Sequence, residues 1–421
     1  MNQSFLLKAL ENRALQFSIL VSATSAGVFA RAAMSPLQEI MRVSLSLDDN
    51  MMALLQGPAM AIPVVIAATP IGIIIDRRSR TTLVLICCAC LSAGTVATAL
   101  ASRFEVLFAA RCLVGLAGPA IWMAAMSLMA DLYQPAQRGR ANMAIVVGQC
   151  LANSASFALG GVLLDLVAPG PDRWRHALLW MATPIMLITL LTLSMREPTK
   201  GKSTVKVPST AEAYLQLWRY RAIVAPVMLG LSLLGVADGA AVTWVAPALA
   251  REYSLAPDRV GSIMGFVLLA SGLAGPIVGG VLADLAHRRG GARYTLFAVT
   301  GLSFLAAPAG LFASAPSTVS ASALLLVFLS AAGAVIVAGT TLLTIVIPGE
   351  LRGLCMALMS AAFLLLGFGV APPLVSLLSG ALGGPLMIGK ALAWVCTSMS
   401  CFGAIAFGFA VNRKSPREVT C

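Results

Sequence analysis

Three charged residues stand inside long apolar stretches of this sequence: Arg31, Arg111 and Asp238. A charge at the centre of a bilayer costs about 2.5–3.5 kcal/mol on insertion scales, so such a residue usually has both a partner and a purpose. A guanidinium group binds two oxygens of a carboxylate or phosphate at once, and an aspartate can take up a proton or neutralise an arginine. These residue types predict a binding site for an anionic group inside the membrane.

Arg31 and Asp238 occupy nearly equivalent positions in the two halves of the chain, and they could face each other across a central cavity. In one hypothesis they form a switchable pair: Arg31 binds the anionic group, and Asp238 takes a proton or neutralises Arg31 when the site is empty. The alternatives are a permanent structural ion pair and two charges that never meet.

Other polar and aromatic residues also fall inside apolar stretches. Gln38 and Asn153 could contact a substrate, although their amides could equally hold helices together by hydrogen bonds. Trp122 and Trp244 could form an apolar wall for an amphipathic substrate, or serve only in packing. The predicted substrate-binding residues are therefore Arg31, Gln38, Trp122, Asn153, Asp238 and Trp244.

The elements that must position these residues are membrane-spanning helices. Of the 421 residues, 59% are apolar and only 11% are charged, whereas a soluble domain carries about 25% charged residues. At about 20 apolar residues per spanning helix the chain can supply about twelve, and the absence of strand alternation argues against a membrane barrel. The apolar runs lie at 14–40, 50–75, 81–101, 104–132, 142–167, 174–195, 221–250, 258–286, 293–313, 319–347, 354–382 and 387–411.

The net charge of +12 comes from 29 basic and 17 acidic residues, and its distribution matters more than its sum. Twenty basic residues fall in one set of alternate loops and only seven in the other set. By the positive-inside rule, both termini and the polar stretch at 196–220 are cytoplasmic, as expected for a bacterial inner (plasma) membrane protein. The basic charge then faces anionic lipid, and no nucleic-acid partner is needed to explain it.

The sequence also repeats itself. The matched positions, 208 residues apart, are Ser46-Leu47 with Ser254-Leu255, Gly57 with Gly265, Gly72 with Gly280, Asp76 with Asp284, and Arg80 with Arg288; Arg138-Gly139 matches Arg352-Gly353 at an offset of 214. Two parallel six-helix halves with a midplane substrate site are an arrangement of secondary transporters. We predict a first half at 1–195, a cytoplasmic linker at 196–220, and a second half with a short tail at 221–421.

These motifs resemble those of the major facilitator superfamily. Gly72 to Arg80 (GIIIDRRSR) is similar to the family's loop 2–3 motif, and Gly280 to Arg288 to its second copy. Arg111 with Gly115 resembles the family's Arg-x-x-x-Gly motif, and the segments at Arg138 and Arg352 resemble its loops 4–5 and 10–11. Arg31, with Asp49-Asn50 and Leu54 to Gly57 (LLQG), resembles spinster-like and anion:cation symporter-type members.

The resemblance implies an all-α integral membrane protein of twelve transmembrane helices in two six-helix pseudo-repeats. In the family, the loop 2–3 cluster latches the halves on the cytoplasmic side, whereas basic residues there could also serve only to fix topology. Gly72 is expected to let its helix approach a neighbour closely. The residues with predicted coupling or gating roles are Asp238, Arg111, Gly72, Asp76, Arg77, Arg80, Gly280, Asp284, Arg288, Arg138 and Arg352.

The function predicted is secondary active transport by alternating access, with a small organic anion, such as a carboxylate, as substrate. An ion gradient, with H⁺ as the coupling ion, would supply the energy, because no ATP site is present. One alternative is efflux or flipping of an amphipathic, lipid-like molecule; another is a non-transporting sensor, which the short tail disfavours. The sequence predicts no enzymatic activity, no cofactor and no metal site, and the superfamily usually works as monomers.

Overall fold

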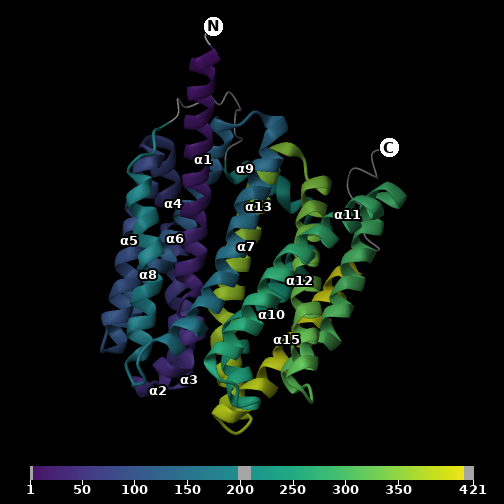
Figure 1. Cartoon of the computed structure of the whole chain (residues 1–421). Coiled ribbons are helices and arrows are strands. Elements are labelled where there is room, and N and C mark those ends of the chain that lie inside the picture. The colour runs from purple at the N-terminus through teal and green to yellow at the C-terminus, as the bar shows by residue number, and fades with distance from the viewer. Residues whose placement is uncertain (1–2, 198–209, 412–421) are drawn as a thin grey trace. The chain divides into compact units, whose positions relative to one another are not determined.

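The computed structural model describes residues 3–197 and 210–411. Within these ranges every regular element is a helix (Figure 1). Eleven helices are long and apolar enough to cross a membrane. One of them, α11 (Pro257–Ala309), contains two helices, because Gly290 and Gly291 have non-helical backbone angles. The described residues therefore supply the twelve predicted spanning helices.

The chain separates into two compact units. The first comprises Met1–Ser203 and Ala256–Phe266, and the second comprises Thr204–Leu255 and Val267–Cys421. The first unit contains α1 (Gln3–Ala32), α2 (Gln38–Ser44), α3 (Asp49–Gln56), α4 (Pro58–Arg77), α5 (Arg80–Leu100), α6 (Phe104–Leu132), α7 (Pro135–Leu166) and α8 (Arg173–Thr192). The domain boundaries set from the sequence stay a prediction.

The second unit begins with a short helix within the predicted linker, α9 (Thr210–Trp218). It continues with α10 (Arg221–Glu252), most of α11, α12 (Thr318–Val346), α13 (Gly349–Phe363), the π-helix η3 (Leu364–Val370), α14 (Ala371–Ala381) and α15 (Ile388–Val411). In α10, 20 of the 32 residues are buried. This helix is thus the central element of its unit, and it carries Asp238.

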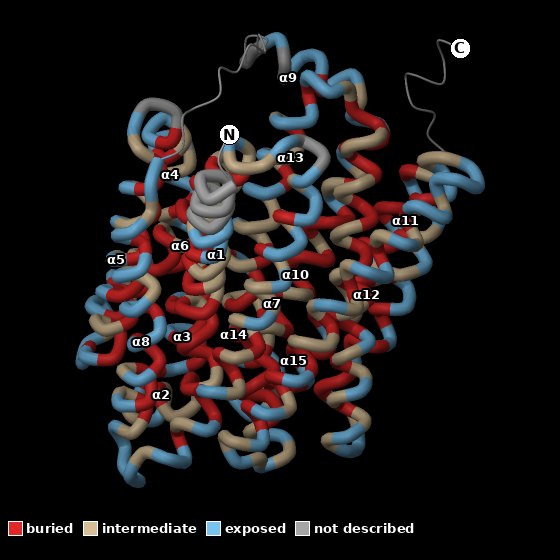
Figure 2. Tube along the Cα trace, turned by 45° about the horizontal axis from the view of Figure 1, so that its top comes forward, coloured by how far each residue is buried: buried red, intermediate tan, exposed pale blue. Residues whose placement is uncertain are grey.

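Buried and exposed residues alternate along the spanning helices (Figure 2), and many of the exposed side chains are large and apolar. Ile66, Leu166 and Phe409 are 73%, 75% and 70% exposed. In water such a surface would be costly, whereas in a bilayer the acyl chains cover it.

The first two predicted spans differ from the expected continuous helices. The run at 14–40 ends its α-helix at Ala32 and restarts at Gln38, after a 3-10 turn η1 (Ser35–Leu37) that contains Pro36. The run at 50–75 breaks between α3 and α4 at Gly57-Pro58. Proline has no N–H to donate and its ring collides with the preceding turn, so each helix stops there. Each interruption leaves carbonyl groups at a helix end inside an apolar region.

Candidate functional site

Arg111 lies where the two interrupted helices end. It belongs to α6 and is 2% exposed. Its Nη2 donates to the carbonyl of Arg31 at 3.0 Å, its Nη1 to that of Ala30 at 3.4 Å, and its Nε to that of Leu55 at 3.4 Å. All three carbonyls are among the last four of α1 or α3, which have no partner within their own helix. One guanidinium group therefore caps the C-termini of two helices.

The glycine of the Arg-x-x-x-Gly motif explains how α4 reaches this place. A Cβ atom on Gly115 would lie 2.6 Å from both the Cα and the carbonyl oxygen of Met60. Only a residue without a side chain lets α6 and α4 pack so closely. The motif thus has two structural roles. Arg111 donates to the free carbonyls at the ends of α1 and α3, and Gly115 lets α4, the helix that follows α3, pack against α6.

A second arginine adjoins this point, because Arg111 donates to the backbone carbonyl of Arg31. The Arg31 residue is only half-buried. Within the part of the chain that the structure describes, Arg111 donates to these three carbonyls and to no carboxylate. Arg111 thus brings a buried positive charge, offset by helix-end dipoles rather than by a described carboxylate, to the end of α1, where Arg31 lies.

A buried amide network lies in the same interrupted segments. Ser35 Oγ donates to Gln56 Oε1 at 3.3 Å, and Gln56 Nε2 donates to Gln38 Oε1 at 2.6 Å. Gln38 is 1% exposed, and its Nε2 has no hydrogen-bond partner among the described residues. Gln38 thus holds the two segments together, which is one of the two roles proposed for it; substrate contact by Gln38 stays a prediction.

Asp238 lies in the second unit, where α10 meets the π-helix η3. A Cβ atom on the next residue, Gly239, would overlap the carbonyl oxygen of Gly367, and one on Gly235 would lie 2.7 Å from the ring of Phe363. The backbones of α10 and η3 are thus in direct contact beside Asp238. Such π-helical segments are frequent at functional sites.

Two further contacts fix α10 in the second unit. Cys396 of α15 donates its thiol to the carbonyl of Ala237 at 3.5 Å. Trp244 is fully buried, and its Nε1 donates to the carbonyl of Pro372 at 3.0 Å, which ties α10 to the start of α14. This is the packing role considered for Trp244, and contact with a substrate stays a prediction.

The remaining predicted substrate residues lie in the first unit. Trp122 packs beside the buried cluster of Met129, Ala141 and Ile145, between α6 and α7. Asn153 is half-buried, and its Oδ1 has no hydrogen-bond partner within the described ranges. Arg31 and Asp238 belong to different units, so their pairing stays a prediction.

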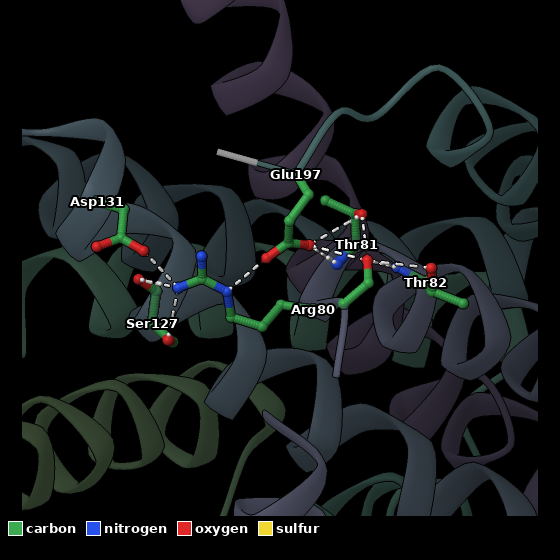
Figure 3. Close-up of polar contacts among 7 residues, drawn as sticks. Arg80, Thr81, Thr82, Ser127, Asp131 and Glu197 are labelled. Atoms are coloured by element: carbon green, nitrogen blue, oxygen red, sulfur yellow. Dashed lines mark hydrogen bonds and ion pairs between the residues drawn. The ribbon is translucent and has the colours of Figure 1, made fainter. Parts of the chain in front are cut away.

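The loop 2–3 motif forms an ion-pair cluster around Arg80 (Figure 3). Arg80 is 3% exposed; its Nη1 donates to Asp131 Oδ2 at 2.5 Å and its Nε to Glu197 Oε1 at 2.8 Å. The same Nη1 also donates to the Ser127 hydroxyl at 3.0 Å. Asp131 is in the last turn of α6 and Glu197 follows α8, so Arg80 joins the ends of three helices within the first unit.

Glu197 was not among the predicted site residues. Its carboxylate lies at the N-terminus of α5, where Oε2 accepts hydrogen bonds from the backbone N–H of Thr81 and from the Ser79 hydroxyl, both at 2.9 Å. Partial burial would raise the pKa of Glu197, but the hydrogen bonds from Thr81, Arg80 and Ser79 outweigh it and lower the pKa from its ordinary value of 4.5. A helix N-terminus favours an anion in the same way. An acidic residue directly after the last apolar run of the half was the available sequence signal.

The second copy of the motif makes no such cluster. Asp284 and Arg288 are exposed, and neither forms an ion pair with another described residue. The side chains of Asp76 and Arg77 lie outside the described residues, although their backbone completes α4. At the repeat offset of 214, the residue that corresponds to Asp131 is Ile345, so the second half lacks that acid.

The structure contradicts the expectation that Gly72 lets its helix approach a described neighbour closely, whereas its coupling or gating role stays a prediction. A Cβ atom on Gly72 would meet no described atom within 4 Å, and the same is true of Gly280. Close helix contacts are made instead by other glycines, among them Gly115, Gly239 and Gly279. The sequence pattern identified the motif but not the helix face on which neighbouring helices pack.

Arg138 and Arg352 confirm the repeat at the level of atoms. Arg138 Nε donates to the carbonyl of Tyr133 at 3.1 Å, and Arg352 Nε to that of Ile347 at 3.2 Å. Each acceptor is five residues before its arginine, directly after a spanning helix. The matched serines also agree, because Ser46 and Ser254 both have a φ of 52°, a value uncommon for residues other than glycine.

Comparisons with known proteins identify the class to which this fold and site belong. Residues 17–247 match the family model of the Major Facilitator Superfamily. The chain therefore belongs to the major facilitator superfamily.

Two relatives give the degree of similarity in sequence. The chain is 27% identical over 398 residues to an MFS-type efflux pump of Mycolicibacterium smegmatis. This match covers 90% of this chain and 88% of that protein. It is 30% identical over 139 residues to a triacylglyceride transporter of Mycolicibacterium hassiacum, a match that covers 33% of this chain and only 25% of that protein.

Solved structures share the fold. A bacterial homologue of the human lysosomal transporter Spinster, inward-facing and unoccupied, matches with a TM-score of 0.79 at 19% identity, over 95% of this chain and 96% of that one. The nucleoside transporter NupG matches with a TM-score of 0.73 at 14% identity, over 95% and 100%. The spinster-like resemblance seen in the sequence is thus confirmed for the fold. The protein is a multi-pass membrane transporter of this superfamily.

Proposed function

We propose that this transporter moves a small organic anion by alternating access, with Arg31 as the residue that binds the anionic group. The observation that carries the proposal is the second guanidinium group, that of Arg111. It is buried and donates to the carbonyls of Ala30, Arg31 and Leu55. A charge compensated only by dipoles strengthens the attraction of a neighbouring arginine for an anion, most of all where the dielectric constant is low.

In this proposal the Arg31 side chain makes the direct contact. Arg111 is buried and directs each of its three nitrogens to a helix-end carbonyl, so in this proposal it acts by its charge and by holding the backbone of Arg31. Asp238 takes up the coupling proton, and α10 transmits its change of charge to η3 through the contact of Gly239 with Gly367. The transporter works as a monomer in the bacterial inner membrane with both termini in the cytoplasm.

The experiment is thermal unfolding of the detergent-purified protein with a panel of carboxylates and a panel of lysolipids. A ligand that binds only the folded state raises Tm as its concentration rises. We expect a carboxylate to raise the Tm of the wild type and of Arg289→Ala, an exposed arginine outside the site, but not that of Arg31→Ala. For the carboxylate so found, Asp238→Asn should bind but should lose transport driven by a pH gradient in proteoliposomes.

A second candidate function is export of an amphipathic molecule. It is favoured by the names of the two relatives, an efflux pump and a triacylglyceride transporter. If lysolipids alone shift Tm, and Arg31→Ala responds as the wild type does, the organic-anion proposal is wrong and this second function replaces it.

A further inference from the structure

The three carbonyls that Arg111 binds form a group of ligands of a recognisable kind. Two come from the C-terminal turn of α1 and one from that of α3, and each helix ends at a proline-containing interruption. The C-terminus of a helix carries a partial negative charge of about half an elementary charge. Two such ends therefore converge on one buried point within the first unit.

In several secondary transporters, the C-terminal ends of interrupted helices and their exposed carbonyls coordinate Na⁺ or another coupling cation. Hard monovalent cations take oxygen ligands, and backbone carbonyls serve well because they bring no charge that must be neutralised. The arrangement around Arg111 provides the same ligand type and the same dipole orientation. Here a side chain supplies the positive charge.

We infer that the Arg111 guanidinium is a covalently attached cation that permanently occupies a carbonyl site of the cation-binding type, and so keeps metal cations out of it. The burial of Arg111, at 2% exposed, requires that its charge be compensated. Its described partners are carbonyl dipoles alone. The first unit thus needs no Na⁺ to hold its interrupted helices together, and any ion coupling depends on other residues.

This inference does not depend on the substrate, because it can be tested on the ligand-free protein. The full chain, fused to a fluorescent protein, is heated in detergent extract and then separated by size-exclusion chromatography. The Tm is the temperature at which half of the fluorescent monomer peak is lost. The measurements compare NaCl, choline chloride and low-millimolar guanidinium chloride at equal ionic strength. The variants are Arg111→Ala and, as a matched control, Arg175→Ala.

Arg175 is a suitable control because it also caps a helix end, donating to the carbonyls of Ala99 and Ala101 at 2.8 and 2.5 Å. Its side chain is 18% exposed, so water can replace it. We expect Na⁺ and guanidinium each to raise the Tm of Arg111→Ala by about 2–4 °C relative to choline. The wild type and Arg175→Ala should show no such difference.

Absence of any cation-specific shift in Arg111→Ala, or an equal Na⁺ shift in the wild type, overturns the inference. If Arg111→Ala gives no monomer peak, Arg111→Lys and Arg111→Gln decide. Lysine keeps the charge with poorer geometry, whereas glutamine keeps hydrogen-bond donors without charge. The inference requires the lysine variant to retain the higher Tm and the larger monomer peak; equal or reversed values contradict it.

Discussion

The Nη2 atom of Arg111 lies 3.0 Å from the backbone carbonyl oxygen of Arg31. One arginine of the predicted site thus holds the main chain of the other, at the point where α1 ends. This relationship joins the family motif in α6 to the proposed anion-binding residue. It also means that changes at the packing surface of α6 should be felt at Arg31, a consequence that can be tested without touching either arginine.

Gly115→Ala should therefore be destabilising. The added methyl group would lie 2.6 Å from the Cα and carbonyl oxygen of Met60, so α4 must move away from α6. Overpacking of this kind costs about 1–3 kcal/mol. The matched control is Gly118→Ala, one turn further on, where the nearest atom would lie at an ordinary 3.6 Å. Thermal unfolding should show a lower Tm for Gly115→Ala alone, and equal values for both variants would contradict this packing.

The Glu197 cluster predicts a dependence of stability on pH. The pKa of Glu197 is lowered in the folded protein from its ordinary value of 4.5. A lowered carboxyl pKa contributes stability that is fully present above the ordinary value and is lost as the pH falls through the lowered one. The Tm of the wild type should therefore decrease when the pH is lowered beyond about 4.5.

The variant Glu197→Gln isolates this contribution. It should have a lower Tm than the wild type at neutral pH and a smaller further loss on acidification. Glu105→Gln, which changes an exposed acid with no hydrogen bond to another described side chain, should follow the wild-type curve. A Glu197→Gln curve parallel to that of the wild type would show that the cluster does not carry the pH dependence.

The sequence predicted the twelve helices because each is a long apolar run, and it predicted the repeat because glycine, serine and arginine recur at fixed offsets. The hydrogen-bond partners of Arg111 could not be predicted in this way. They are backbone carbonyls at residues 30, 31 and 55, exposed only because Pro36 and Gly57-Pro58 interrupt two helices whose hydropathy stays high throughout. The dipeptide Gly57-Pro58 was the local signal for the second interruption.

Glu197 shows a different difficulty. Its partners, Ser79, Arg80 and Thr81, are more than 110 residues away in sequence, and no pattern within one half pairs the end of the sixth span with the start of the third. For Gly72 the motif was recognised, but the expected close contact with a neighbouring helix is absent among the described residues. A glycine in a sequence does not reveal which helix, if any, approaches it. The helix face that each residue presents was fixed by tertiary packing alone.

Arg138 and Arg352 should contribute unequally to stability although they are repeat partners. Arg138 donates to two carbonyls, those of Tyr133 and Ala130, the latter at 2.7 Å, whereas the described hydrogen bond of Arg352 is to Ile347 alone. Arg138 is also the less exposed of the two. Arg138→Ala should cost about 1 kcal/mol and Arg352→Ala less. Thermal unfolding beside Arg289→Ala measures both, and a larger loss for Arg352→Ala would refute the ranking.

Gly239→Ala tests whether the contact between α10 and η3 matters for transport. The added methyl group would overlap the carbonyl oxygen of Gly367, and a π-helix has little freedom to retreat because Pro372 and the bond from Trp244 hold the start of α14. The two helices must separate beside Asp238, so we expect a lower Tm and loss of transport.

Gly301→Ala is the matched control for this last change. Its methyl group would meet no described atom within 4 Å, so its Tm should stay within the scatter of the wild type. The informative result is a Gly239→Ala protein that folds, because its substrate affinity and its transport rate can then be compared. Retained binding with lost transport would assign the α10–η3 contact to the conformational step, since Asp238 would still be present while its link to η3 had been broken. Unchanged transport at wild-type Tm would rule out that role for the contact.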